Sequence, residues 1–203
     1  IGDFAVDWKT RKIWIGTGEV NSSRSSYAGV GVYFSSDTGK TWQYKGLPES
    51  HHIGKIIIHP TEPNTVFVAV LGHLFSANPD RGIYKTTDGG TSWRKVLSVD
   101  DNTGAVDMQM DPKNPAIIYA AMWHRERRMW NFVEGGASSG IYKSTDGGET
   151  WKRMDKGLPG GASHIIGKTS IDMAQSNPKV VYALVEDKTP ALYKSIDGGD
   201  SWN

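Results

Sequence analysis

Short apolar runs alternate with polar turns along the whole chain, and no segment shows the 3.6-residue spacing of an amphipathic helix. In the second quarter, the apolar runs 55–58 and 65–70 flank a polar turn with two prolines at 59–64. A second pair of short runs follows and flanks a turn rich in Ser, Asp and Gly, which is typical of a hairpin. The other quarters repeat this order. The pattern therefore predicts an all-β chain with four antiparallel strands in each unit.

The second turn of each unit is one repeated phrase, S/T-x-D-x-G-x-S/T-W. Its aspartates stand at intervals of 51, 58 and 51 residues, and its four copies occupy residues 35–42, 86–93, 144–151 and 195–202. Four-stranded units repeated at about this period are typical of propeller blades. We predict a β-propeller of four-stranded antiparallel blades, about four of them in this chain, with approximate bounds 1–46, 47–98, 99–157 and 158–203.

The chemistry of the phrase favours a structural role. The Asp carboxylate is able to accept hydrogen bonds from backbone N–H groups of its own turn, and a hydroxyl side chain does the same. The fifth-position Gly tolerates a positive φ, and the Trp ring buries a large apolar area. We therefore interpret twelve residues as structural rather than catalytic or metal-binding: Asp37, Gly39, Trp42, Asp88, Gly90, Trp93, Asp146, Gly148, Trp151, Asp197, Gly199 and Trp202.

The phase of the repeat predicts an incomplete ring. The chain opens on the first strand of a unit, lacks an initiator Met and stops at Asn203, just inside the fourth strand of the last unit. In closed propellers, a strand from one terminus usually completes the blade at the other terminus. The repeat in this chain begins with the first strand of a unit, so it has no extra strand for that purpose. We expect an excerpt or a mature form, most simply a piece of a larger propeller, completed by other segments or subunits.

Composition excludes several function classes. The 203 residues carry a net charge of +1, so no bulk field favours nucleic acid or a membrane surface. No apolar run is long enough to span a bilayer. Cysteine is absent, which excludes disulfides and thiolate metal sites. No residue pattern indicates a nucleotide, a haem or a nucleic acid, and we expect no cofactor.

One face of the units carries the chemically richer loops. Connections within a blade alternate between two faces, so the loops after the second and fourth strands share one face, opposite the repeated phrase. These loops mix Arg, His, carboxylates and aromatic rings, which suits sugars, peptides or anionic groups. The candidate ligand-binding residues are Glu19, Asn21, Arg24, Tyr27, His73, Arg81, Trp123, His124, Arg125 and Trp130.

Several residues on this face leave alternatives open. Arg125 and its arginine neighbours either clamp a carboxylate or belong to a solvated basic loop. Glu19 is either a general acid/base or a carboxylate that tethers its own loop. The catalytic candidates on this face are Glu19, Asp80 and Glu134. The adjacent His51 and His52 lack a third ligand nearby in the sequence, so we predict no metal site.

The repeated phrase resembles the Asp-box, or bacterial neuraminidase repeat, of sialidases, xyloglucan-active glycoside hydrolases and sortilin-type receptors. Two further stretches, 14–21 with Arg24-Ser25 and 70–74 with 81–84, resemble bacterial sortilin-like repeat proteins that are often labelled glycosyl hydrolases. The resemblance implies a much longer bacterial protein that is secreted, periplasmic or on the outer surface. It also implies that the Asp-box lies away from the ligand face.

The resemblance carries over few catalytic residues. Sialidase-like chemistry would draw on Arg24, Arg81 and Arg125, with Tyr27 and Glu19 as the nucleophile pair, but the Arg-Ile-Pro motif of sialidases is missing. Xyloglucan-active relatives place two aspartates across a cleft between two propellers. This chain supplies at most part of one propeller, so that pair is not transferred.

Two main functions follow from these observations. The first is a non-catalytic recognition or scaffold propeller that binds a peptide, protein or glycan on its loop face, or serves as a structural part of an assembly. The alternative is a glycoside hydrolase, sialidase- or xyloglucanase-like, acting on an extracellular glycan. Hydrolysis generally requires two opposed carboxylates, which here would come from different blades.

Overall fold

The computed structural model describes residues 1–203 as a series of antiparallel sheets, with one short 3₁₀ helix, η1 (Pro48–Ser50). The first sheet contains β1 (Asp3–Asp7), β2 (Lys12–Gly16), β3 (Val32–Ser35) and β4 (Gln43–Tyr44). The second contains β5 (Ile53–Ile58), β6 (Val66–Val70), β7 (Gly82–Thr86) and β8 (Arg94–Leu97). The third contains β9 (Thr103–Met110), β10 (Ile118–His124), β13 (Gly140–Ser144) and β14 (Lys152–Met154). The fourth contains β15 (Thr169–Met173), β16 (Val181–Val185) and β17 (Ala191–Ser195).

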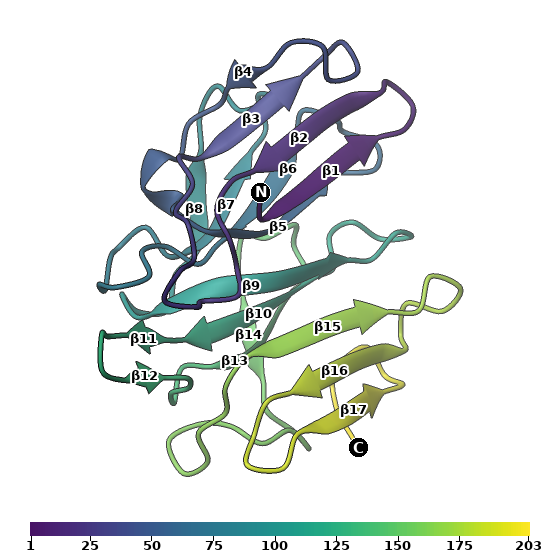
Figure 1. Ribbon diagram of the computed structural model, residues 1–203. Coiled ribbons are helices and arrows are strands. Elements are labelled where there is room, and N and C mark those ends of the chain that lie inside the picture. Colours follow the sequence, from purple (N-terminus) through teal and green to yellow (C-terminus); the bar gives the residue numbers. More distant parts are fainter.

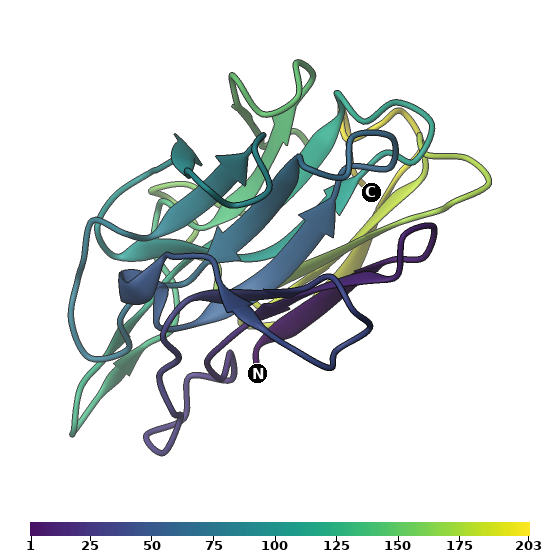
Figure 2. The same cartoon turned by 90° about the horizontal axis from the view of Figure 1, so that it is seen from above.

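The sheets follow one another through the molecule, from the purple first sheet to the yellow last one (Figure 1). Seen from above, the strands of all sheets are aligned roughly along one common axis, and the loops emerge at both ends of the strands (Figure 2). The prediction of an all-β propeller segment with four-stranded antiparallel blades is confirmed. The last sheet has three strands, and Asn203 exchanges two backbone hydrogen bonds with Lys194, where the other sheets begin their fourth strand. No helix is long and apolar enough to cross a membrane.

Burial along the strands reflects their place in this series. All five residues of β6 are buried, because neighbouring sheets cover both faces of the second sheet. In β16 buried positions alternate with more open ones, and Leu184 is 55% exposed. Its cross-strand partner Leu192 is 64% exposed. In this last sheet, one face of the strand therefore packs against the preceding sheet and the other face is open to solvent.

The first strands of successive sheets lie side by side, β1 against β5, β5 against β9, and β9 against β15. Side-chain carboxylates join two of these pairs. Asp3 accepts a hydrogen bond from Ile56 N at 2.8 Å, and Asp107 accepts one from Ile171 N at 2.9 Å. Between β5 and β9 the backbones approach directly, because a Cβ on Gly54 would lie 2.4 Å from the Val106 carbonyl oxygen.

Each Asp-box carboxylate closes its own turn. Asp88 accepts hydrogen bonds from the Thr86 hydroxyl at 2.7 Å, the Ser92 hydroxyl at 2.6 Å and Ser92 N at 3.0 Å. Equivalent bonds surround Asp37, Asp146 and Asp197, so the four acids occupy four separate turns. Hydrogen bonding lowers the pKa of all four carboxyls, and that of Asp37 falls to about 2.

The Asp-box turns also contact the preceding sheet. Lys85 Nζ donates to the Gly147 carbonyl at 2.9 Å, and Lys143 Nζ donates to the Gly198 carbonyl at 2.6 Å. The buried Tyr119 hydroxyl donates to the same Gly198 oxygen at 2.7 Å. Of the box tryptophans, Trp93 donates to the Lys45 carbonyl of the preceding sheet at 2.7 Å, whereas Trp151 and Trp202 donate to glycine carbonyls of their own turns.

Trp42 departs from the expected burial of the box tryptophans. Its ring is 40% exposed, whereas Trp202 is 6% exposed and packs in the core with Tyr119. No sheet precedes the first one in this chain, so Trp42 has no partner surface. Burial of a box tryptophan therefore depends on the preceding blade and not on its own turn.

Candidate functional site

The loops after the second strands and between the sheets meet on one face of the molecule, named here the loop face. Backbone hydrogen bonds connect them across sheets: Gly29 N donates to the His51 carbonyl at 2.6 Å and Asn78 N to the Asp101 carbonyl at 3.0 Å. Arg125 N donates to the Asn102 carbonyl at 3.0 Å. The predicted site residues lie in these loops, but the structure separates them into buried and exposed sets.

Arg81 is buried and holds three loops together. Its guanidinium group donates to the carbonyl oxygens of His73 at 2.8 Å, Ser76 at 3.0 Å and Arg125 at 3.1 Å, and also to that of Asn102. Burial lowers its pKa to about 10, and the group remains protonated at neutral pH. The side chain is 1% exposed and its hydrogen bonds go to the chain itself, so it is not available to an external ligand.

Arg125 fills a similar role one sheet further along. It is fully buried and donates to the Gly72 carbonyl at 3.2 Å and to the Ser22 hydroxyl. Burial and the nearby Arg81 charge lower its pKa to about 9. A sialidase-like set of three convergent arginines requires guanidinium groups that reach a ligand. The structure does not support that arrangement for Arg81 and Arg125, because both bind loops.

The aromatic candidates also divide by exposure. Trp123 is 3% exposed, and its indole N–H donates to the Glu134 carbonyl at 2.7 Å. Its ring is therefore not offered to a ligand. Trp130 is 78% exposed in the turn that joins β11 (Glu126–Arg127) to β12 (Phe132–Val133), and Tyr27 is 77% exposed. These two rings are free to stack on a ligand from solvent.

The loop 17–31 positions the first group of candidates. Glu19 holds this loop, since its carboxylate accepts a hydrogen bond from Tyr27 N at 3.3 Å and its N–H donates to the Tyr27 carbonyl at 3.1 Å. Asn21 accepts a hydrogen bond from Ser26 at 2.5 Å. Arg24 is exposed. Of the two interpretations of Glu19, the geometry favours the loop-tethering carboxylate.

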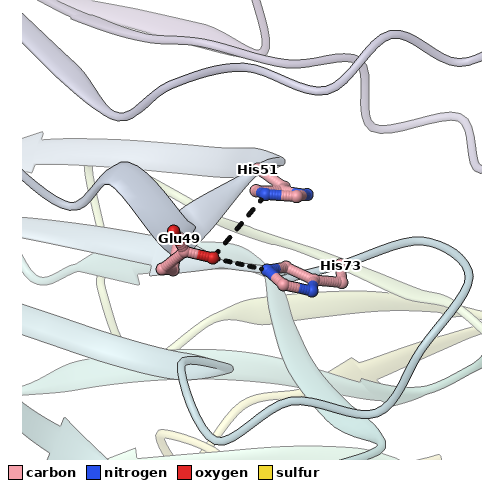
Figure 3. A group of neighbouring side chains, drawn as sticks. All are labelled: Glu49, His51 and His73. Atoms are coloured by element: carbon pink, nitrogen blue, oxygen red, sulfur yellow. Dashed lines mark hydrogen bonds and ion pairs between the residues drawn. The ribbon is translucent and has the colours of Figure 1, made fainter.

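A cluster of Glu49, His51 and His73 forms where two loops meet (Figure 3). Glu49 and His51 follow β4 at η1, and His73 follows β6. Glu49 Oε2 lies 3.0 Å from His73 Nε2 and 3.9 Å from His51 Nε2. The two imidazole rings stack with centroids 3.8 Å apart. Burial, with the nearby His73, lowers the pKa of His51.

The fold thus separates the adjacent histidines that the sequence presents as a pair. His51 faces the cluster, whereas His52 is 1% exposed and points into the interior between the loops. Burial lowers the pKa of His52 to about 4, so its ring is neutral at neutral pH. Neither Glu49 nor the pairing of His51 with His73 was identified from the sequence, because His73 comes from the loop after β6, whereas Glu49 and His51 stand close together before β5.

Two hollows open among the loops of this face. One of about 210 Å³ is lined by Leu47, Pro48, Glu49, Ser50, Asp80 and Tyr84. Burial and the nearby Asp80 raise the pKa of Tyr84 to about 12. The other, of about 290 Å³, is lined by Phe75, Ser76, Ala77, Asn102, Glu126, Arg127 and Arg128. The side chain of Arg128 is exposed and pairs with Glu126 at 2.7 Å.

The remaining candidates are His124, Glu134 and Asp80, which lie at different places on the loop face. His124 lies 3.5 Å from Glu126 and is largely covered. Glu134 is exposed, and its backbone carbonyl holds Trp123. Asp80 is half-buried and accepts a hydrogen bond from the Asn78 amide at 3.3 Å. Of the three carboxylates named as catalytic candidates, only Asp80 lines a hollow.

Solved structures with the same fold cover nearly the whole chain. The crystal structure of an ancestral GH74 enzyme superposes with a TM-score of 0.73 and 21% identity, covering 99% of this chain and 23% of its own. The GH74 enzyme of Niastella koreensis superposes with a TM-score of 0.70 and 19% identity, covering 98% of this chain and 28% of its own. At this identity the likeness establishes the propeller fold alone.

The proteins that are similar to this chain in sequence include xyloglucanases. The xyloglucanase Xgh74A of Acetivibrio thermocellus is 24% identical over 85% of this chain and 22% of its own length. The oligoxyloglucan-reducing end-specific xyloglucanase of Emericella nidulans is 24% identical over 96% of this chain and 26% of its own length. The chain thus spans about a quarter of the length of these relatives.

A family model covers the centre of the chain. The Sortilin-Vps10 model, described as sortilin, neurotensin receptor 3, matches residues 30–158, which is more than half of the 203 residues. The matched region contains the Asp-boxes of the first three sheets and most of the loop face. The chain belongs to the Sortilin-Vps10 family.

Proposed function

We propose that the intact protein acts on a polysaccharide and that this chain supplies part of its glycan-binding face. The observation that carries the proposal is the superposition of nearly the entire chain on GH74 enzymes, together with its sequence similarity to xyloglucanases. This favours the glycoside hydrolase among the functions expected from the sequence. We further propose that residues 1–46, 47–98, 99–157 and 158–203 are successive blades of a larger propeller, completed by other segments.

The loop face has the groups that sugar binding requires. Exposed aromatic rings stack on the apolar faces of sugar rings, and Tyr27 and Trp130 are both exposed there. Charged and polar groups then fix the hydroxyls. The second hollow supplies Asn102, Glu126 and Arg128 for this purpose. A polymeric glycan substrate also implies a location outside the cytoplasm, secreted, periplasmic or on the outer surface.

For hydrolysis, this chain offers Asp80 as one carboxylate and leaves the second to the rest of the propeller protein. Glycosidases use two carboxyl groups on either side of the scissile bond. Asp80 lies beside Tyr84 in the 210 Å³ hollow, where a sugar oxygen has access. Glu19 serves its own loop instead, and the buried Arg81 and Arg125 argue against sialidase-like chemistry.

The test uses the intact protein with soluble xyloglucan. We expect retardation in gels that contain the polysaccharide and release of new reducing ends. Trp130→Ala weakens retardation by about fivefold, since stacking of an aromatic ring contributes on the order of 1 kcal/mol. Asp80→Asn lowers the release of reducing ends. Asp200→Asn, in an exposed Asp-box turn on the opposite face, is the matched control and leaves both measurements unchanged.

The outcomes separate the alternatives. Retardation without release of reducing ends supports the recognition propeller and contradicts hydrolysis. Failure to bind xyloglucan or any other neutral or acidic polysaccharide contradicts the proposal as a whole. Full activity of both Trp130→Ala and Asp80→Asn would show that the glycan binds elsewhere in the protein.

A further inference from the structure

We propose that Glu49, His51 and His73 form a zinc-binding site on the loop face. Two imidazole nitrogens and one carboxylate oxygen make a donor set that Zn²⁺ accepts in proteins, with a fourth position left for water or a ligand oxygen. The ligand atoms of the three side chains all lie within 4.8 Å of one another. This inference does not depend on the proposed action on polysaccharides.

The geometry is close to that of a bound ion. Ligand atoms around a tetrahedral Zn²⁺ with bonds of about 2.0 to 2.1 Å stand about 3.3 Å apart. Glu49 Oε2 and His73 Nε2 are 3.0 Å apart, and Glu49 Oε2 and His51 Nε2 are 3.9 Å apart. Both histidines present Nε2 to the same carboxylate oxygen (Figure 3). Because the two rings are stacked nearly parallel, one of them has to rotate out of the stack for both Nε2 lone pairs to point at one ion.

Neighbouring contacts hold the two loops in position. The other ring nitrogen of His73 lies 3.2 Å from the Ser76 hydroxyl, a contact of the kind that orients metal-ligating histidines. Arg81 fixes the same loop through the His73 and Ser76 carbonyls. On the other loop, the His51 carbonyl accepts a hydrogen bond from Gly29 N at 2.6 Å. The ligands thus stand on preorganised backbone.

An ordinary ion pair explains only part of this arrangement. One hydrogen bond at 3.0 Å joins Glu49 to His73, whereas His51 at 3.9 Å is too distant to donate one. The stacked rings would also repel each other if both were protonated. The side chains of Glu49, His51 and His73 are 59%, 32% and 26% exposed, so an ion has access from solvent. A shared cation satisfies all three groups at once.

His164 and Asp187 provide a matched comparison on another loop. They pair at 2.7 Å, with the histidine side chain 50% exposed, but no third ligand joins them. His164→Ala therefore removes a histidine–carboxylate pair without removing the proposed site. His73→Ala and Glu49→Gln each remove one ligand from the proposed site and alter partly exposed side chains.

The experiment is calorimetric titration of the metal-free intact protein with zinc sulfate, together with thermal unfolding with and without zinc. We expect one ion per protein at this site and a rise in melting temperature with zinc. His73→Ala, His51→Ala and Glu49→Gln each weaken binding at least about tenfold and reduce the rise. His164→Ala binds zinc like the parent protein.

Two results would overturn the proposal. One is the absence of zinc binding by the parent protein at millimolar zinc. The other is binding whose affinity is unchanged in all three ligand variants, which would place the ion elsewhere. Circular dichroism of the metal-free variants identifies any that fail to fold, and the remaining variants then decide the assignment.

Discussion

Asp37 and its three counterparts show how one side chain is able to fix a turn without being buried. Each carboxylate accepts a backbone N–H and hydroxyl groups from the same eight residues, and the hydroxyl four positions later is the largest cause of its lowered pKa. The bonds are local, so the phrase is recognisable in the sequence. The same reasoning explains why four matching acids do not form one site.

The lowered pKa values predict an acid-sensitive stability. A carboxyl whose pKa is lower in the folded than in the unfolded chain stabilises the fold fully above its unfolded value and loses this contribution as pH falls toward the folded value. The pKa of Asp37 is about 2 in the folded protein, whereas its ordinary value is 3.8. We therefore expect the free energy of unfolding to decrease as the pH falls from about 4 to about 2. Urea unfolding followed by tryptophan fluorescence measures it.

The comparison variant is Asp37→Asn, which retains the shape of the side chain and removes its charge. It lowers stability at pH 7 and makes the dependence between pH 4 and pH 2 shallower. Asp200→Asn, at an exposed carboxylate that accepts no turn hydrogen bond, keeps the slope of the parent chain. Equal slopes for all three proteins would contradict the assigned role of Asp37.

At the scale of the sheet, stability depends on the contact between one blade and the next turn. Tyr119 and Lys143 are cross-strand partners, and both donate to the Gly198 carbonyl of the following Asp-box. Tyr182 and Lys194 occupy the same relation in the last sheet, where no further turn follows. The chain therefore contains the same residue pair with and without its neighbour.

Tyr119→Phe removes the hydroxyl from this contact and lowers the free energy of unfolding by about 1 kcal/mol, the usual net contribution of such a hydrogen bond. Tyr182→Phe, in the uncovered copy, changes it by less than about 0.5 kcal/mol. Urea unfolding of the 203-residue chain measures both. Equal losses would show that the tyrosine hydroxyl acts within its own sheet and not between sheets.

Most strands are predictable from the sequence, because alternation and turn residues act locally in β-structure. The sequence does not indicate the small hairpin of β11 and β12 inside the loop 123–134, whose two-residue strands have no periodicity to detect. It also does not indicate the burial of Arg81, since a charged residue in a loop is ordinarily exposed. Carbonyl oxygens from three loops converge on this side chain, and only the assembled sheets bring them together.

The same limit applies to the candidate site. The loop face was predictable from loop length and composition, and Tyr27, Arg24 and Trp130 are exposed on it. The cluster of Glu49, His51 and His73 was not, because His73 comes from the loop after β6, whereas the other two residues precede β5. Metal sites are recognised in a sequence by short, fixed spacings between their ligands, and ligands from separate loops have no such spacing.

At the scale of the molecule, the two end sheets present apolar surface. Phe4 in the first sheet is 64% exposed, and Leu184 and Leu192 form an exposed cross-strand pair on the last one. In the second and third sheets, the face that corresponds to the one with Leu184 and Leu192 receives the next Asp-box turn. An uncovered face of this kind is typical of a surface that another segment covers.

The 203-residue chain on its own is therefore expected to self-associate. The double variant Leu184→Lys, Leu192→Lys adds charge to the exposed pair and shifts the chain toward monomer in sedimentation velocity. The control Thr61→Lys, Gln175→Lys adds the same charge at exposed turns and leaves association unchanged. A parent chain that is monomeric at high concentration would contradict this prediction.

The contact of Lys85 and Lys143 with the following Asp-box has a consequence for how such chains lengthen. The eight-residue phrase closes its own hairpin and also offers a glycine carbonyl to the lysine of the blade before it. A duplicated gene segment that encodes one blade inherits both halves of this joint. Rings of different circumference are then reachable by copying alone, without the evolution of a new interface.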